Sequence, residues 1–305
     1  MDNAVRVCAI DVGTNTVVSL VADVGPGGTL DVLADETRFA RLGQGVDATG
    51  RLAPEAMDRV VDRLAGAAET ARRLGAVHVG IAATSASRDA ANVGDLVARV
   101  RRELGLDYRV ISGEEEAALS FRGALAALPG VPEATVCDIG GGSTEIVSGR
   151  AGKPPRTRTS LDVGSVRLTE RYFSERPPSP SAVDAADGAV RQALQAVPAG
   201  AAVAPLVMTG SVAQIFARLS GAADEAPSVS AASVAAWRRR LLALAPDEAL
   251  ALAPDVLAGR EDVIAAAVLL LDVVMDELGA GEYVATPGGL RYGLALEMAE
   301  ALRGR

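Results

Sequence analysis

The stretch Val136-Cys137-Asp138-Ile139-Gly140-Gly141-Gly142-Ser143-Thr144-Glu145-Ile146-Val147 is an apolar run that three glycines break and that then resumes. This pattern predicts a strand, a tight turn at Gly140 to Gly142, and a second strand. Glycine has no Cβ and adopts positive φ without strain, so we expect the N–H groups of the turn to converge on an anion such as phosphate. Asp138 and Glu145 flank the turn, where their carboxylates are expected to hold a divalent cation or to orient a water.

The same pattern occurs earlier in the chain. Residues 7–22 again form an apolar run, which is broken at Asp11-Val12-Gly13-Thr14-Asn15-Thr16 and then resumes. Asp11 and Asp138 are 127 positions apart, and such a long repeat favours two related halves. We expect the two halves to face each other across a cleft, with Asp11 opposite Asp138. An ordinary β-turn remains the alternative for either glycine-rich turn by itself.

Length and composition limit the class of protein. The 305 residues are 49% hydrophobic and 23% charged, which is typical of a globular chain large enough for two domains. The net charge of −9 argues against general nucleic-acid binding. The apolar run from Val263 to Leu271 is too short to cross a membrane and is expected to form a buried helix. A basic segment followed by an apolar stretch, the pattern of a signal sequence, is not expected after Asp2. These features predict a cytoplasmic protein.

The sequence contains two cysteines and one histidine. Cys8 and Cys137 occupy equivalent places in the strands before the two turns, which favours structural thiols. His78 lies in an apolar run, where a core or edge position is more consistent with the pattern than a catalytic role. Because no Cys/His set suits zinc, any metal is expected on oxygen ligands, which favours Mg²⁺ or Mn²⁺.

Arg88 follows the predicted buried strand at residues 77–82, at the point where α/β sheets present groups to ligands. It is interpreted either as a phosphate ligand or as a solvated arginine that Asp89 neutralises.

Ser112 followed by Glu114, Glu115 and Glu116 predicts the start of a helix. Acidic residues in the first turn interact favourably with the helix dipole and complete a capping box with Ser112. The alternative is that one of these carboxylates acts as the base for an attacking water. Both interpretations account for the three glutamates.

The remaining pattern gives the order of elements. Residues 122–135, which contain Gly123, are predicted to join the halves, so the domains are expected at 1–122 and 123–305. Helices are predicted at 54–74, at 92–104 and over most of 230–278, with a last helix from about Leu294. Thr209-Gly210-Ser211 repeats the pattern of strand, glycine-containing turn and helix.

Five segments together resemble the exopolyphosphatase/guanosine pentaphosphate phosphohydrolase family, within the superfamily of actin-like sugar kinases and chaperone ATPases. The chain looks like the short, two-domain form of that family. Near the C-terminus, Pro287-Gly288-Gly289-Leu290 departs from the more usual Asp-Gly-Ala-Leu type of sequence, and Arg291 is given no role. The resemblance spans nearly the whole chain, through residues 9–15, 83–89, 111–117, 138–145 and 287–293.

The resemblance implies an α/β fold of two actin-like (ribonuclease H-like) domains, each with a mixed sheet flanked by helices, and a cleft between them. It implies that Glu116 is catalytic and that Asp11, Asp138 and Glu145 hold Mg²⁺ or Mn²⁺. The phosphate-binding residues that it implies are Gly13, Thr14, Asn15, Thr16, Arg88, Gly140, Gly141, Gly142, Ser143, Gly210 and Ser211.

The expected function is metal-dependent hydrolysis of the terminal phosphoanhydride of inorganic polyphosphate, with water activated by Glu116. The alternative is hydrolysis of guanosine pentaphosphate to the tetraphosphate, a reaction of the stringent response. An ATP-dependent kinase and a non-catalytic nucleotide-binding regulator are the other classes considered, and the glutamate segment argues against the kinase. The expected partners are polyphosphate or guanosine pentaphosphate, without nucleic acid or membrane, and a homodimer is left open.

Overall fold

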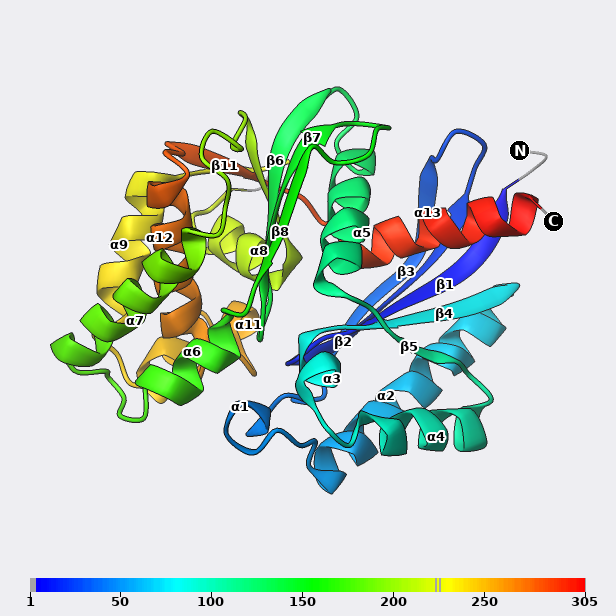
Figure 1. The fold of residues 1–305 in the computed structure, drawn as a ribbon, viewed down its shortest axis with the longest axis horizontal. Coiled ribbons are helices and arrows are strands. Elements are labelled where there is room, and N and C mark those ends of the chain that lie inside the picture. Colours follow the sequence, from blue (N-terminus) through cyan, green and yellow to red (C-terminus); the bar gives the residue numbers. More distant parts are fainter. Residues whose placement is uncertain (1–3, 223, 225, 305) are drawn as a thin grey trace. The chain divides into compact units, whose positions relative to one another are not determined.

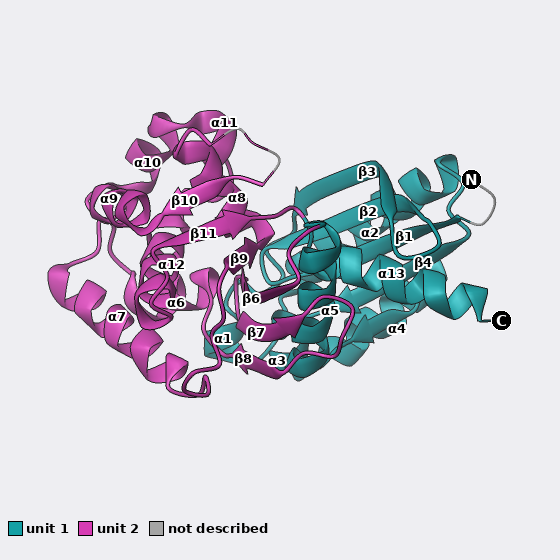
Figure 2. Cartoon of the chain, turned by 90° about the horizontal axis from the view of Figure 1, so that it is seen from above, with its two compact units in different colours: residues 1–129, 288–305 teal, residues 130–287 magenta. Residues whose placement is uncertain are grey.

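The computed structural model describes residues 4–222, 224 and 226–304, so Asp2 lies outside the described residues. The chain divides into two compact units, one formed by residues 1–129 together with 288–305 and the other by residues 130–287 (Figure 2). The predicted domains were 1–122 and 123–305. In the structure the first boundary lies after residue 129, and residues 288–305 belong to the first unit.

The first unit is built on a mixed sheet that has, over the described residues, five strands in the order β3-β2-β1-β4-β5. Side chains alternate along β1, so Cys8 and Ile10 lie on one face and Val7 and Ala9 on the other, and all four are buried. A strand that is buried on both faces needs the continuous apolar sequence that this segment has. The strands are β1 Val5–Val12, β2 Thr16–Val24, β3 Leu30–Phe39, β4 His78–Ala83 and β5 Tyr108–Val110.

Helices cover both faces of this sheet (Figure 1). Residues of α2 and α4 pack with Cys8 and Ile10, and residues of α13 pack with Val7 and Ala9. Helix α2 begins at Pro54, which suits the first turn of a helix because an N–H at that position has no intrahelical partner. The helices are α1 Val46–Thr49, α2 Pro54–Arg73, α3 Ser85–Asp89, α4 Val93–Leu104, α5 Gly113–Ala126 and α13 Leu290–Arg303.

Glycines allow α5 and α13 to approach closely. A Cβ on Gly123 would lie 2.0 Å from the carbonyl oxygen of Gly289, and a Cβ on Gly293 would lie 2.1 Å from that of Leu119. The sequence prediction placed Gly123 in a linker over residues 122–135, and that was wrong, because α5 continues to Ala126. This packing explains why the C-terminal helix belongs to the first unit.

The second unit has the same topology with one added edge strand. Over the described residues its sheet has six strands in the order β10-β11-β9-β6-β7-β8. β6 is antiparallel to β7 and parallel to β9, as β1 is to β2 and β4. Asp138 pairs with Thr209 across β6 and β9, and Asp11 pairs with Ala82 across β1 and β4, again 127 positions apart. The strands are β6 Glu133–Ile139, β7 Thr144–Arg150, β8 Thr157–Leu161, β9 Leu206–Thr209, β10 Ser228–Ser230 and β11 Glu282–Ala285.

Helix α12 lies at the centre of the second unit's core. All residues from Ile264 to Leu271 are buried, as the sequence predicted. A helix that is apolar on every side must be surrounded by other elements, and α12 contacts α6, α7, α8 and α9 (Figure 1). Along the described chain, no helix combines the length and apolar character that crossing a membrane requires. The helices are α6 Ser165–Tyr172, α7 Pro180–Leu194, α8 Gly210–Leu219, α9 Ala231–Leu241, α10 Pro246–Leu252, α11 Pro254–Leu257 and α12 Ile264–Glu277.

The predicted α/β class, with mixed sheets flanked by helices, is confirmed in each unit. Two local predictions were wrong, and one strand was missed. Helix α13 begins at Leu290 instead of near Leu294, and β10 was not predicted, since three residues are too few to show a period. The strand at residues 77–82 was predicted to be buried, but its first residues are exposed: Val77 is 70% exposed, and His78 is also exposed.

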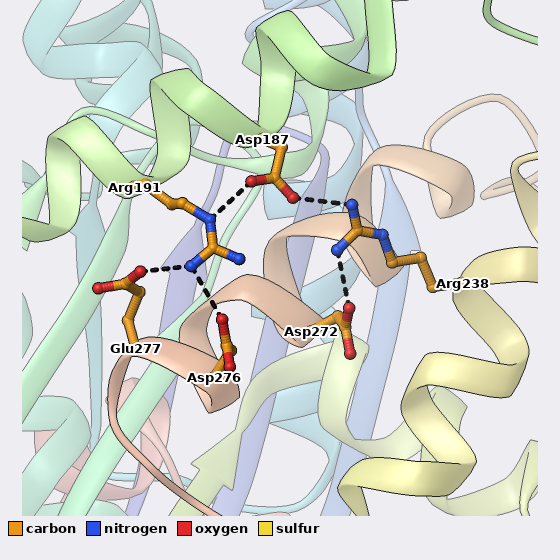
Figure 3. A network of polar contacts seen from close by, with 6 residues as sticks. All are labelled: Asp187, Arg191, Arg238, Asp272, Asp276 and Glu277. Carbon is orange, nitrogen blue, oxygen red and sulfur yellow. Dashed lines mark hydrogen bonds and ion pairs between the residues drawn. The ribbon is translucent and has the colours of Figure 1, made fainter. Parts of the chain in front are cut away.

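An ion-pair network joins α7, α9 and α12 (Figure 3). Asp187 accepts hydrogen bonds from Arg191 Nε and Arg238 Nη2, both at 2.7 Å. Burial by itself raises the pKa of Asp187, but the hydrogen bonds from the two arginines outweigh it, so the pKa lies below its ordinary value. The same arginines also donate to Asp272, Asp276 and Glu277.

We expect Asp187→Asn to lower the free energy of unfolding at pH 7 by about 1.5–3 kcal/mol, because it weakens two charge-assisted hydrogen bonds. The folded-state pKa is depressed, so this contribution is present above the ordinary pKa of 3.8 and is lost as the pH falls through the folded-state value. Denaturant unfolding between pH 7 and pH 3 measures the difference from wild type. Asp184→Asn, an exposed aspartate on α7, is the control. An equal decrease in the free energy of unfolding in both variants would contradict this role of Asp187.

Candidate active site

The turn between β6 and β7 holds its two carboxylates side by side. Asp138 and Glu145 are directly opposite each other in the antiparallel register. The N–H of Gly140 donates to the carbonyl of Ser143 at 2.9 Å and closes the turn, so it is not one of the anion donors that the sequence predicted. The equivalent bond in the first turn joins Gly13 N–H to the carbonyl of Thr16, also at 2.9 Å.

The start of α6 holds the carbonyl groups of the second turn. The N–H of Ser165 donates to Gly140 O at 3.0 Å, and the N–H of Val166 donates to Gly141 O at 2.8 Å. Arg167 Nε donates to Gly142 O at 2.9 Å. Three successive carbonyls of the turn are therefore fixed toward α6.

The peptide N–H groups of this turn consequently point the other way. In a trans peptide the N–H is directed opposite to the carbonyl of the preceding residue. Because the carbonyls of Gly140, Gly141 and Gly142 face α6, the N–H groups of Gly141, Gly142 and Ser143 face away from it. Among the described residues, no hydrogen bond to these three N–H groups is present. Three successive amides directed to one side form the kind of concavity that binds anions.

The first turn is held in the same manner by the chain that follows β3. The N–H of Gly43 donates to Thr14 O, and the N–H groups of Ala40 and Arg41 both donate to Asn15 O. By the same peptide geometry, the N–H groups of Asn15 and Thr16 are directed away from residues 40–43. The side chain of Thr14 is buried, so this residue contributes its backbone to the turn.

Close packing at the second turn depends on Gly164, the residue before α6. We expected positive φ there, but no glycine from Gly140 to Gly142 is among the described residues with positive φ. The crowding comes from α6: a Cβ on Gly164 would lie 2.5 Å from Gly141 O. Gly210 does have positive φ, at 79°, and a Cβ there would lie 2.6 Å from Asp138 Oδ1. Gly210 thus lies beside Asp138, whereas Ser211 is exposed on α8.

We expect Gly164→Ala to raise the KM for the substrate at least several-fold and to destabilise the protein by about 1–3 kcal/mol, because the new methyl forces α6 away from the turn. Gly188→Ala is the matched control, since Gly188 lies inside α7 and a Cβ added there would meet no atom within 4 Å. That control should be neutral or slightly stabilising. Steady-state kinetics and thermal unfolding of both variants test this. A wild-type KM in Gly164→Ala would contradict a role of the second turn in substrate binding.

The carboxylate pair suits a hard divalent cation. Glu145 is 2% exposed, and it accepts a hydrogen bond from Ser160 Oγ at 2.8 Å, which orients one of its oxygens. Within the described residues, no group of three or more His, Cys, Asp or Glu side chains is arranged to hold a metal. Two carboxylates still fit Mg²⁺ or Mn²⁺, because Mg²⁺ commonly keeps several waters and takes further oxygen ligands from phosphates. The counterpart of Glu145 in the first hairpin is Val18, opposite Asp11, so only the second turn pairs two carboxylates.

Arg88 and Glu116, which were predicted separately as phosphate ligand and catalytic residue, contact each other. Arg88 Nη1 donates to Glu116 Oε2 at 2.6 Å and to the carbonyl of Ile111 at 3.2 Å. Their side chains are 20% and 10% exposed. A guanidinium at this distance stabilises the ionised carboxylate, which is the form that a general base requires.

The three glutamates at the start of α5 have different surroundings. Glu114 is exposed, Glu115 forms an ion pair with Arg109, and Glu116 is buried beside Arg88. Ser112 Oγ accepts the N–H of Glu115 at 3.2 Å, so the predicted helix cap is present. The cap and the buried carboxylate therefore coexist, and Glu116 differs from its neighbours.

Arg291 has a partner that the sequence did not indicate. It forms a two-pronged ion pair with Asp35 on β3, at 2.9 and 2.7 Å, and stacks over Tyr292. Burial lowers the pKa of Arg291, but the hydrogen bonds to Asp35 outweigh this and raise it, with a smaller contribution from the nearby charge of Asp11. Arg291 thus anchors the start of α13 to β3 and places a positive charge near Asp11.

Both cysteines are buried and free. Burial raises the pKa of Cys8 to about 12, and burial together with the charges of Asp138 and Glu145 raises the pKa of Cys137 well above its ordinary value. Neither thiol ionises near neutral pH, which agrees with the predicted structural role.

Sequence reasoning missed the residues that hydrogen-bond to the backbone carbonyls of the two turns. The groups that bind the carbonyls of the turns lie 25–29 positions after them, just beyond β3 and β8, and nothing local marks them. Gly43 and Gly164 both allow close approach to their turns, but they lie 121 positions apart, so the repeat at 127 positions does not align them. The missed contacts include Arg167, Ser160 and the segment 40–43.

The two mixed sheets share one topology, and each begins with a hairpin that carries an Asp-x-Gly turn, so the chain is an α/β protein built of two related units. Comparison with family profiles gives a match to the Ppx/GppA phosphatase family over residues 20–302. The chain belongs to the Ppx/GppA phosphatase family.

Individual relatives agree with this assignment. Exopolyphosphatase 2 of Mycobacterium tuberculosis is 46% identical over 200 residues, an alignment that covers 62% of this chain and 62% of that protein. The chain therefore spans less than two thirds of the length of the curated relatives that it matches. Among solved structures, an exopolyphosphatase-like protein has a TM-score of 0.88 at 29% identity and covers 99% of this chain and 100% of that one. An exopolyphosphatase from Cytophaga hutchinsonii has a TM-score of 0.87 at 25% identity, with 97% and 98% covered.

Proposed function

We propose that this protein is an exopolyphosphatase, which releases terminal orthophosphate from inorganic polyphosphate by attack of water. The observation that carries the proposal is the second turn, where three peptide N–H groups face one side and the carboxylates of Asp138 and Glu145 lie opposite each other. Amides suit phosphate oxygens, and paired carboxylates suit the cation that accompanies a polyphosphate.

Hydrolysis of a phosphoanhydride depends mainly on positioning and on neutralising the charge of the transferring phosphoryl group. The N–H groups of Gly141, Gly142 and Ser143 bind phosphoryl oxygens, and Asp138 and Glu145 hold Mg²⁺ or Mn²⁺. When bound, the cation supplies positive charge at the phosphoryl oxygens. Ser160 keeps Glu145 oriented through its 2.8 Å hydrogen bond. The roles predicted for Asp11, Gly13 to Thr16, Gly210 and Ser211 are retained as part of this proposal.

Glu116 acts as the general base. Its carboxylate accepts a proton from the attacking water as the oxygen–phosphorus bond forms, while the bond to the leaving polyphosphate breaks. Arg88 Nη1, at 2.6 Å from Glu116 Oε2, orients this carboxylate. An arriving phosphoryl group competes for the same guanidinium, so substrate binding weakens the hold on Glu116 and makes its carboxylate available to water.

Guanosine pentaphosphate ranks second as a substrate. The bond to be broken is the same, but the Mycobacterium tuberculosis relative and the Cytophaga hutchinsonii structure described above are named exopolyphosphatases. A kinase and a silent regulator rank lower, because neither requires a buried glutamate beside an arginine.

The test is a phosphate-release panel with purified protein and Mg²⁺ or Mn²⁺. The substrates are polyphosphates of several lengths, guanosine pentaphosphate and ATP, at matched phosphoanhydride concentrations. We expect the highest kcat/KM with polyphosphate. A higher value with guanosine pentaphosphate would reverse the ranking, transfer of phosphate from ATP to an acceptor would indicate a kinase, and no turnover on any substrate would indicate a regulator.

A further inference from the structure

Tyr108 is a buried tyrosine that the proposed reaction does not use. It is 5% exposed, and its hydroxyl forms a hydrogen bond of 2.8 Å with Ser87 Oγ, in which either oxygen can be the donor. Ser87 is completely buried. Buried hydroxyl groups need a protein partner, because bulk water does not reach them. The two side chains supply that partner to each other.

The hydrogen bond joins two short elements of the first unit. Helix α3 has five residues and β5 has three. Tyr108 is the first residue of β5 and pairs with Ile81 in β4, whereas Ser87 lies in α3, beyond the end of β4. The tyrosine side chain therefore reaches from the start of one strand to the helix that follows its neighbour. A helix of about one turn is not stable by itself, so contacts of this kind decide where α3 lies.

Other contacts hold the start of α3 and its apolar side. The N–H of Thr84, the residue before α3, donates to the carbonyl of Val12 at 3.1 Å. Ala86 packs in the core on the α2 side of the sheet. Contacts between methyl groups have no preferred direction, whereas a hydrogen bond constrains both distance and angle. The hydrogen bond between Ser87 and Tyr108 therefore limits how far α3 can rotate about its own axis.

The rotation of α3 decides where Arg88 points, because Arg88 directly follows Ser87 in the helix. Its guanidinium donates to the carbonyl of Ile111 at 3.2 Å and to Glu116 Oε2 at 2.6 Å. Tyr108 and Ile111 belong to one segment, residues 108–111. This segment thus holds two successive residues of α3, the serine through a buried hydroxyl and the arginine through a carbonyl.

The hydroxyl of Tyr108 keeps its proton at neutral pH. Burial raises the pKa of Tyr108 well above its ordinary value, the hydrogen bond with Ser87 lowers it in part, and the negative charge of Asp11 adds to the rise. A phenol with this pKa does not exchange protons with a substrate near pH 7. Its contribution is therefore a fixed hydrogen bond.

We propose that Tyr108 is a positioning residue, which through its hydrogen bond to Ser87 holds α3 so that the Arg88 guanidinium stays at Glu116. This inference rests on the proposed function for the reaction in which Arg88 and Glu116 take part. Tyr108 itself does not contact the substrate and acts through Arg88.

Tyr108→Phe and Ser87→Ala each remove one hydroxyl of the pair and little else. We expect each change to lower kcat for polyphosphate about tenfold, because small displacements of groups at the reacting centre are costly in rate. A variant with both changes should be no slower than the slower single variant, since the two changes remove the same hydrogen bond. In an Arg88→Gln background, adding Tyr108→Phe should change kcat less than about twofold, because the group that Tyr108 positions is absent.

Ser148→Ala is the matched control for the loss of a buried hydroxyl. Ser148 is 1% exposed, and its Oγ forms a hydrogen bond of 3.0 Å with Thr135 Oγ1. It lies in the half of β7 that is remote from the second turn. This variant should melt a few degrees lower than wild type, as Ser87→Ala should, but keep the kcat of wild type.

Hydrogen–deuterium exchange of residues 84–89 measures the hold on α3 without turnover, because the N–H groups of Ser87 and Arg88 donate to the carbonyl of Thr84. We expect exchange at least about fivefold faster in Tyr108→Phe and Ser87→Ala, and wild-type exchange in Ser148→Ala. This result supports the inference even if the wild type hydrolyses no polyphosphate, which would defeat only the proposed function.

Three results would overturn the inference while hydrolysis by the wild type stands. The first is wild-type kcat or wild-type exchange of residues 84–89 in both Tyr108→Phe and Ser87→Ala. The second is an undiminished effect of Tyr108→Phe on kcat in the Arg88→Gln background. The third is a loss of kcat in Ser148→Ala equal to that in Ser87→Ala, which would show that the loss of any buried hydroxyl slows the enzyme.

Discussion

Glu116→Gln is expected to lower kcat for polyphosphate by at least about a hundredfold, because a general base contributes roughly 10² to 10⁴ in rate. Glutamine keeps the size of the side chain but cannot take the proton of the attacking water. The variant also leaves the part-buried guanidinium of Arg88 without its carboxylate, so we expect a stability loss of about 1–3 kcal/mol. Thermal unfolding, tripolyphosphate binding and steady-state kinetics on the same preparation separate these effects.

Glu114→Gln is the matched control, since Glu114 lies in the same first turn of α5 but is exposed. A charge at a helix start contributes about 0.3–1 kcal/mol to stability, and its loss should leave kcat unchanged. If the two substitutions affect kcat equally, Glu116 has only a capping role. Glu115 would then be the next candidate for the base, with its ion pair to Arg109 as the first contact to remove.

Removal of divalent cations with EDTA is expected to lower turnover by at least about a hundredfold, and Mg²⁺ or Mn²⁺ should restore it, because the cation neutralises charge that the protein's own groups cannot. Glu145→Gln and Asp138→Asn should each raise the cation concentration needed for half-maximal activity. Neither change adds or removes side-chain volume, so the fold should persist.

Asp162→Asn is the control for these two variants, because Asp162 is exposed just before α6 and should leave cation dependence unchanged. Full activity after rigorous removal of metal would refute the assignment of the carboxylate pair. If Glu145→Gln has the same cation dependence as wild type, the cation does not bind at the second turn.

The hairpins and their turns could be predicted from sequence because the signals are local. An apolar run that glycine breaks and that then resumes predicts strand, turn and strand. The repeat at 127 positions predicted two related halves, and the strand pairings of the two sheets are offset by the same 127 positions. The sequence signals for the cap at Ser112 and for the buried helix α12 were also local.

The contacts that complete the site depend on distant parts of the chain, and sequence reasoning could not find them. The pairing of Arg88 with Glu116 joins residues 28 positions apart, and the amides of α6 reach back 25 positions to the second turn. The return of α13 to the first unit depends on glycines in two helices far apart in the chain. The placement of Asp11 relative to Asp138 concerns both units and stays a prediction.

The central claim is that water attacks the terminal phosphoryl group of polyphosphate. Orthophosphate release should be measured from two samples of the same polyphosphate, one with free ends and one with both ends blocked as phosphoramidates, in the presence of Mg²⁺. The account predicts steady release of orthophosphate from the free-ended chains and almost none from the blocked chains. Equal release from both samples, or the appearance of internal fragments from the blocked chains, would contradict it.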